Sequence, residues 1–147
     1  MIVVFDSDVL IPLILPASRS TRLLARLRSA GHKVALAPLI LDEVADKLRT
    51  SKKLRKWLQL PDKDIEQFLS DLPRLCLLIP GQLTIAGAVP ADPKDDKILG
   101  AAKESGAAYV ISEDRHLRKL DVWEGIKIMK RDEFMAELNR LELKDQN

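Results

Sequence analysis

Short apolar runs alternate with helical segments along almost the whole chain, and this alternation constrains the fold more than any other feature. Five runs lack a helical period and are predicted strands: 2–5, 33–37, 75–79, 108–112 and 126–129. The segments between them show helical spacing or helix start and stop signals, and they give predicted helices at 20–31, 39–49, 60–73, 95–107, 113–120 and 131–143. Strands that alternate with helices form a parallel sheet covered by helices on both faces. We therefore expect an α/β fold.

A chain of 147 residues fits one domain that buries its core without disulfides or a structural metal. We expect a single domain over 1–143 and a frayed tail over 144–147. The lone cysteine, Cys76, lies in an apolar stretch, where a buried structural thiol is expected. The first apolar stretch is interrupted by Pro12 and Pro16 and follows acidic residues, unlike a signal peptide or a membrane span. The sequence therefore predicts a cytoplasmic protein without a membrane partner.

The net charge of +2 hides an uneven distribution of charge. Residues 1–56 contain 11 Lys and Arg against 5 Asp and Glu, a net charge of +6, and the rest of the chain has a net charge of −4. Much of the excess lies in one basic segment, which has the composition of a phosphate-contacting surface: Lys47, Arg49, Lys52, Lys53, Arg55 and Lys56. A solvated helix face is the alternative explanation. Trp57, beside the segment, is suited either to stacking on a base or to filling an apolar seam.

Acidic residues follow the predicted strands at the points where those strands end. Asp6 and Asp8 come directly after the first strand, and Asp114 follows Ser112 at the end of the fourth. Asp96 opens the helix that leads into that fourth strand. Glu43 lies off the apolar stripe of its predicted helix, on the side that can reach the same edge. In an open parallel sheet the ligand crevice lies beyond the carboxyl ends of the strands, so we expect these acids to share one crevice.

Four carboxylates within several ångströms repel one another unless a cation lies between them. Mg²⁺ and Mn²⁺ prefer oxygen ligands, and the chain lacks the Cys and His set of a structural zinc site. A divalent ion held by acids suits phosphodiester hydrolysis. Each acid also has an ordinary explanation, because Asp95, Asp96 and Asp114 fit helix caps and Glu43 fits a surface position.

Several short motifs, in their order along the chain, resemble those of PIN-domain nucleases. "FDSDVL" (5–10) resembles the family's first strand and its Asp-Thr-Asn, with Ser7 and Asp8 in place of Thr and Asn. "LDEVADKL" (41–48) resembles its helix with a glutamate, and "DPKDDKILGAAKESGAAYVIS" (92–112) its acidic motif before a helix and strand. "SEDRHLRKL" (112–120) resembles its Thr-x-Asp motif, and "GIKIMKRDEF" (125–134) its last strand and helix. The likeness extends to the branch described as toxins of toxin–antitoxin systems.

The resemblance implies a three-layer α/β/α sandwich with a five-stranded parallel sheet, a PIN-like and Rossmann-like fold. It also implies cleavage of single-stranded RNA with Mg²⁺ or Mn²⁺, frequent homodimers, and an antitoxin protein that blocks the acidic crevice. The catalytic and metal-binding residues that it implies are Asp6, Glu43, Asp96 and Asp114, with Asp8, Asp92, Asp95 and Ser112 as helpers. The basic segment would then be the RNA track.

Two other functions fit parts of the pattern. "FDSDVL" also resembles the Asp-x-Asp motif of haloacid-dehalogenase-like phosphatases, in which the first Asp is a nucleophile. That family has Gly-Thr or close equivalents after the second Asp, whereas Val9 and Leu10 stand here. A catalytically silent PIN-like module that binds RNA or protein is the other alternative, although such modules typically lose acids from the crevice.

Overall fold

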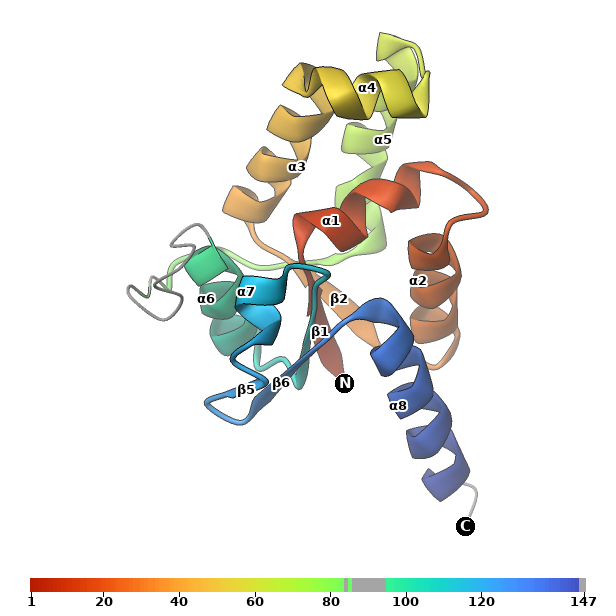
Figure 1. Ribbon diagram of the computed structural model, residues 1–147. Coiled ribbons are helices and arrows are strands. Elements are labelled where there is room, and N and C mark those ends of the chain that lie inside the picture. Colours follow the sequence, from red (N-terminus) through yellow and green to blue (C-terminus); the bar gives the residue numbers. More distant parts are fainter. Residues whose placement is uncertain (84, 86–94, 146–147) are drawn as a thin grey trace.

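The computed structural model describes residues 1–83, 85 and 95–145, and its centre is a six-stranded sheet (Figure 1). The strand order is β3-β2-β1-β4-β6-β5. The strands are β1 (Ile2–Phe5), β2 (Lys33–Leu36), β3 (Leu77–Leu78), β4 (Tyr109–Ile111), β5 (Val122–Trp123) and β6 (Ile126–Met129). All neighbouring pairs are parallel except β5 with β6. The expected α/β fold with a parallel sheet is confirmed.

The expected number of five strands is wrong, because β5 adds a sixth. Its two residues pair antiparallel with β6, Val122 opposite Lys127 and Trp123 opposite Ile126. The turn between them places Glu124 at φ 48° and Gly125 at φ 82°, the two positive values that a tight hairpin turn requires. A two-residue strand has no period to detect, so only Gly125 signalled this turn in the sequence.

Helices cover both faces of the sheet and give the expected three layers. One face packs against α6 (Asp96–Ser105), and α2 (Arg19–Ser29) and α8 (Arg131–Asp145) lie together on the other (Figure 1). Three helices stand above the carboxyl edge of the sheet: α3 (Pro38–Thr50), α4 (Lys52–Leu58) and α5 (Asp62–Leu75). The short helices are α1 (Ser7–Leu10), η1 (Ile11–Ile14) and α7 (Arg115–Arg118). None of the helices in the described residues is both long and apolar enough to cross a membrane.

Some helix boundaries differ from those expected. The basic segment is divided between α3 and α4, because Ser51 ends α3 and its Oγ accepts a hydrogen bond from the Leu54 N–H at the start of α4. The helix expected to end at Pro73 continues to Leu75 with the proline in its last turns. The last helix, α8, includes residues 144 and 145 of the expected tail, and residues 146–147 lie outside the described residues.

The core lies where the central strands meet α6 on one side and α2 and α8 on the other. Val4 and Val110, on neighbouring strands, are fully buried, as is Leu99 of α6. On the opposite face the rings of Tyr109 and Phe134 pack with their centroids 5.0 Å apart. Cys76, expected to be buried, is half-buried at the edge of this core, and its partial burial raises the pKa of the thiol to about 11. This packing fixes β1 and β4 side by side, and with them the residues at their ends.

Candidate metal centre

Three aspartates converge at the carboxyl edge of the sheet, above the adjacent strands β1 and β4. Asp6, Asp95 and Asp114 each offer a carboxylate oxygen, and these oxygens lie within 4.8 Å of one another. Asp6 follows β1, Asp95 precedes α6, and Asp114 precedes α7. We call these three residues the carboxylate triad. They line a hollow of about 240 Å³, the acidic hollow, together with Ser7, Asp8, Glu43 and Lys47.

Asp6 is held at both carboxylate oxygens. Its Oδ1 accepts a hydrogen bond of 2.7 Å from the Ser7 N–H, at the start of α1, and its Oδ2 accepts one of 2.7 Å from the Ser112 hydroxyl. The side chain is only 4% exposed. Burial raises the pKa of Asp6 above its usual value, although both hydrogen bonds favour the ionised form. Asp6 is thus an oriented carboxylate whose negative charge is costly in the absence of a cation.

Ser112 connects two members of the carboxylate triad. While its hydroxyl donates to Asp6, its Oγ accepts a hydrogen bond of 3.0 Å from the Asp114 N–H. Asp114 in turn caps α7, since its Oδ1 accepts a hydrogen bond of 2.8 Å from the His116 N–H. Burial raises the pKa of Asp114, but hydrogen bonds with Asp95 and from His116 bring it below its usual value. Capping uses one carboxylate oxygen and leaves the second to face the acidic hollow.

Asp8 lies on the wall of the acidic hollow, beside the carboxylate triad. Its Oδ2 accepts a hydrogen bond of 3.1 Å from the Glu113 N–H. Its Oδ1 is buried and has no hydrogen-bond partner among the described residues. Burial, followed by the nearby charge of Asp6, raises the pKa of Asp8 to about 7. A buried oxygen without a donor is a position that a cation or a water molecule can satisfy.

Glu113 is a supporting residue that the sequence did not single out. Its Oε1 accepts hydrogen bonds of 3.1 Å from both the backbone N–H and the Nε of Arg131, at the start of α8. The Arg131 Nη1 also donates to Ser20 of α2, at 3.1 Å. Glu113 therefore links the Asp8 side chain to the layer of α2 and α8. Its place between Ser112 and Asp114 was the only signal for this role in the sequence.

Two lysines bring positive charge to the acidic hollow. Lys97 Nζ donates to Glu43 Oε1 at 2.8 Å, and Lys47 Nζ donates to Ser7 Oγ at 2.8 Å. Burial raises the pKa of Glu43, but its hydrogen bonds with Lys97 and Ser7 and the charges of both lysines bring it below its usual value. Glu43 therefore lies in the hollow as expected, and it is already paired with a cation. The sequence predicted Lys47 as part of an RNA track, but it did not predict that Lys97 pairs with Glu43.

The structure brings Asp95, rather than Asp96, into the carboxylate triad. Asp95 stands at the N-cap position of α6 and makes no capping hydrogen bond with its side chain, so it does not serve as the expected cap. Asp96, one residue later, lines a separate side pocket of about 300 Å³. Neighbouring residues at a helix start point in different directions, and the sequence alone did not show which one faces the crevice. The expected helper Asp92 lies outside the described residues.

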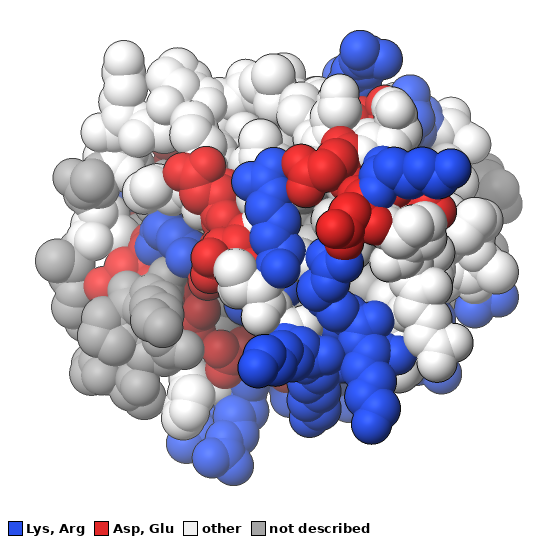
Figure 2. Space-filling view, turned by 90° about the horizontal axis from the view of Figure 1, so that it is seen from above, with Lys and Arg blue, Asp and Glu red and all other residues white. Residues whose placement is uncertain are grey.

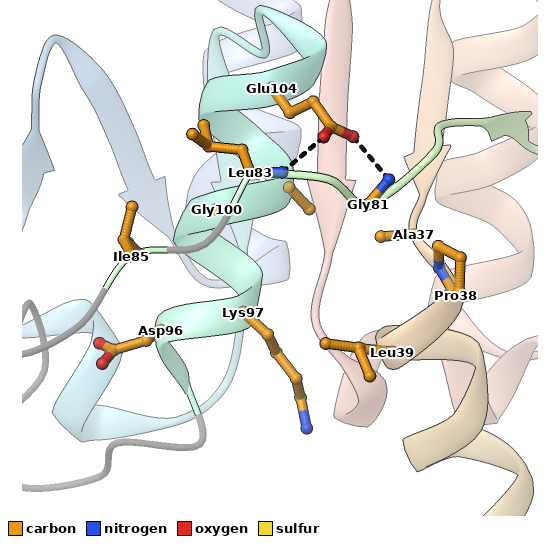
Figure 3. A pocket seen from close by; sticks show the side chains of 11 residues that line it. Ala37, Pro38, Leu39, Gly81, Leu83, Ile85, Asp96, Lys97, Gly100 and Glu104 are labelled. Carbon is orange, nitrogen blue, oxygen red and sulfur yellow. Dashed lines mark hydrogen bonds between the residues drawn. The ribbon is translucent and has the colours of Figure 1, made fainter.

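The side pocket lies between the start of α3, one flank of α6 and the segment that follows β3 (Figure 3). Glu104 of α6 holds that segment, because its carboxylate accepts hydrogen bonds from the N–H groups of Gly81, Gln82 and Leu83 at 2.6–2.8 Å. Apolar groups form most of the remaining wall, including Leu39 and Ile85. Since Asp96 belongs to this wall, it lies beside the carboxylate triad and outside it.

The donor set of the acidic hollow fits a hard divalent cation. All three members of the carboxylate triad offer oxygen, and in the described part of the chain the group includes no Cys or His. Carboxylates so close together repel each other, and a divalent cation reverses that repulsion. The partnerless Oδ1 of Asp8 provides a further oxygen nearby. The acidic hollow could therefore bind a metal ion of the Mg²⁺ or Mn²⁺ type.

Figure 2 shows Lys and Arg side chains beside Asp and Glu side chains on the face seen from above. Two arginines of the basic segment are engaged, Arg49 with Glu66 at 2.7 and 2.9 Å and Arg55 with Asp62. In contrast, three lysines are exposed and have no hydrogen-bond or ion-pair partner in the described residues: Lys52, Lys53 and Lys56. Only part of the basic segment is therefore available to a ligand.

The fold and sequence were compared with known proteins. A search of curated proteins found no match. The fold is similar to a chain in the crystal structure of VapBC2 from Rickettsia felis bound to a DNA fragment from their promoter, with a TM-score of 0.60 and 12% identity. The similarity covers 87% of this chain and 97% of that chain. The family model of the PIN domain matches residues 2–116, a range that includes the whole carboxylate triad. This chain belongs to the PIN domain family.

Proposed function

We propose that the protein is an endoribonuclease that depends on a divalent metal ion and cleaves phosphodiester bonds of single-stranded RNA. The observation that carries the proposal is the carboxylate triad, whose oxygens lie within 4.8 Å of one another in an open hollow. Membership of the PIN domain family supports nuclease activity. The same family membership argues against the alternative of a haloacid-dehalogenase-like phosphatase.

In this proposal Asp6, Asp95 and Asp114 hold Mg²⁺ or Mn²⁺. When bound, the ion would lower the pKa of a coordinated water and offset negative charge on the scissile phosphate. Ser112 orients Asp6 and Asp114 toward each other through its two hydrogen bonds. Asp8 adds a further carboxylate oxygen beside the carboxylate triad, since its Oδ1 has no hydrogen-bond partner among the described residues. We assign Glu43, which lines the same hollow, the role of positioning water or holding a second ion.

Lys47 belongs to both the acidic hollow and the basic segment. Its Nζ reaches Ser7 Oγ at 2.8 Å, between the two aspartates that follow β1. We propose that it contacts the phosphate to be cleaved, since a lysine beside clustered acids offsets their repulsion of a polyanion. Arg49 and Arg55 contact acidic residues of α5 and serve mainly to hold α3, α4 and α5 together. The lysines of α4 continue the RNA track.

We further propose that the protein is the toxin of a toxin–antitoxin pair in the cytoplasm. The support is the resemblance of its motifs to that branch of the family, together with a fold similar to that of a chain in the VapBC2 structure. A small antitoxin protein that covers the acidic hollow would keep RNA from the carboxylate triad. A homodimer is the expected state of the free toxin.

The proposal is tested by incubating purified protein with single-stranded RNA of mixed sequence in Mn²⁺, Mg²⁺ or EDTA. We expect cleavage that requires the metal ion and falls at least about 100-fold in Asp6→Asn. Asp132→Asn is the matched control, because Asp132 is 71% exposed and its ion pair among the described residues is with Arg19, also at the surface. A Mn²⁺-dependent rise in melting temperature shows whether each variant still binds the ion. Metal binding without cleavage of any RNA would favour the catalytically silent module.

A further inference from the structure

The outer face of α4 exposes a tryptophan. Trp57 is 64% exposed, whereas Leu58 is buried and Leu54 is half-buried against the core. The apolar side of α4 therefore packs inward through the two leucines, and Trp57 lies outside that contact. The expectation that Trp57 could fill an apolar seam is not met within the described residues. The large aromatic ring of Trp57 is therefore available for contact with a ligand.

Two lysines lie close to Trp57 on the same helix. Lys53 is one helical turn before it, and Lys56 is its neighbour in the chain. Both are exposed and have no hydrogen-bond or ion-pair partner in the described residues. The arginine of α4 differs, because Arg55 contacts Asp62 and donates to the Leu48 carbonyl at 3.3 Å. The helix thus uses its arginine for structure and leaves its lysines and tryptophan in solvent.

α4 follows directly on the helix that lines one wall of the acidic hollow. Glu43 and Lys47 on α3 line the hollow, and α4 follows α3 after the single residue Ser51. Trp57 comes ten positions after Lys47, on the helix that follows. Figure 2 shows Lys and Arg side chains close to the acidic side chains on this side of the molecule. A polyanion bound in the hollow would therefore meet positive charge on its way to Trp57.

We propose that Trp57 stacks on a base of single-stranded RNA a short distance from the cleavage site, while Lys53 and Lys56 contact the flanking phosphates. The inference rests on the proposed ribonuclease function and adds a binding residue outside the hollow. Stacking on aromatic side chains within a basic groove is a general mode of single-strand recognition. It favours single strands over duplexes, whose bases are already stacked, and it imposes little sequence preference.

The charge of this face supports RNA as its occupant. A second copy of the chain would bring a second set of unpaired lysines to the same contact, and like charges that face each other are unfavourable. An acidic protein partner would satisfy the lysines but would not require an aromatic ring. The test must therefore separate stacking from apolar packing.

The experiment uses the fluorescence of Trp57 itself. The chain has two tryptophans, so Trp123→Phe leaves Trp57 as the only one. This protein is titrated in EDTA, which prevents cleavage, with a single-stranded RNA dodecamer and with the same sequence as a duplex. We expect saturable quenching by the single strand and little by the duplex. In the otherwise unsubstituted protein, Trp57→Ala should weaken binding by about tenfold or more, and Trp57→Phe should restore most of the affinity.

Trp57→Leu distinguishes stacking from apolar contact, because leucine retains apolar area and loses the ring. Leu143→Ala, at a residue that is also 64% exposed, is the matched surface control. We expect Trp57→Leu to bind RNA as weakly as Trp57→Ala, and the control to bind normally. The double replacement of Lys53 and Lys56 by alanine should flatten the dependence of affinity on salt.

The inference is overturned if RNA binds with unchanged Trp57 fluorescence, or if Trp57→Ala changes only the oligomeric state. Cleavage in Mn²⁺ by the unsubstituted protein is measured separately, so that failure of the ribonuclease proposal is recognised on its own.

Discussion

Lys97 Nζ lies 2.8 Å from Glu43 Oε1 and joins the first turn of α6 to the middle of α3. Both side chains are largely buried, with exposures of 22% and 19%. An ion pair that is shielded from water is stronger than one on the surface. A further cation that binds Glu43 Oε1 would therefore compete with the ammonium group of Lys97.

Replacing Lys97 with methionine should strengthen Mn²⁺ binding in the absence of RNA. The substitution removes a positive charge close to the carboxylate triad and releases Glu43, which we expect to increase affinity about threefold to thirtyfold. Isothermal titration calorimetry measures both the affinity and the number of ions bound. Lys103→Met is the control, since Lys103 is on the same helix and pairs with Glu124 at the surface. Equal Mn²⁺ affinity in all three proteins would contradict the prediction.

Asp95→Asn and Asp96→Asn should have unequal effects, because only Asp95 belongs to the carboxylate triad. We expect Asp95→Asn to reduce Mn²⁺ affinity and RNA cleavage by about 100-fold or more, and Asp96→Asn to reduce them much less. Both substitutions preserve shape and change the charge by the same amount. A larger loss of Mn²⁺ binding in Asp96→Asn would reverse the assignment made from the structure.

Asp8 should make the metal-free protein less stable as the pH rises. Its pKa is about 7 in the fold, against 3.8 for an ordinary aspartate, so between pH 4 and 7 the folded state holds a proton that the unfolded state has lost. The stability from this proton is complete below pH 4 and is lost by about pH 7, an effect of at most about 4 kcal/mol. Urea unfolding in EDTA at pH 5 and pH 8 should show a smaller decline for Asp8→Asn. If the free energy of unfolding fell equally with pH in Asp8→Asn and in the unsubstituted protein, the prediction would be contradicted.

Gly81→Ala should destabilise the protein more than Gly31→Ala. Both glycines have positive φ, 74° and 79°, so an added side chain causes backbone strain of about 1 kcal/mol in each case. A Cβ at Gly81 would also lie 2.9 Å from Pro38 Cδ, whereas one at Gly31 would meet no atom within 4 Å. The difference in the free energy of unfolding, measured with urea, isolates this contact. Equal losses of unfolding free energy in the two variants would indicate that the segment after β3 shifts away from Pro38.

Much of the architecture was accessible from local sequence patterns. The β-branched run before Asp6 and the apolar run before Ser112 predicted the strands that became β1 and β4. Since parallel strands end at a common edge, the meeting of Asp6 and Asp114 followed from the order of strands and helices. Short-range irregularities were less accessible: β5 has only two residues, and the boundary of α4 depends on one hydrogen bond of Ser51.

The arrangement within the site depended on side-chain directions that no periodicity encodes. Asp95 and Asp96 are neighbours of identical type, and the backbone at the start of α6 decides which one meets Asp114. The pairing of Lys97 with Glu43 joins residues 54 positions apart. Charge patterns predicted a basic segment but did not reveal that Arg49 and Arg55 are occupied by acids of α5.

Arg131 contacts Glu113 from a part of the chain that follows all the carboxylates of the triad. The residues that supply the carboxylates and the residues that set their geometry therefore lie in different parts of the sequence. Every member of the carboxylate triad precedes residue 115, yet Ser112 N–H donates to the Met129 carbonyl and Glu113 is fixed by Arg131. A fragment that stops after Leu120 would keep all three aspartates of the carboxylate triad and lose both supports. We therefore expect truncation from the C-terminus to disable the candidate metal centre while leaving its aspartates in the chain.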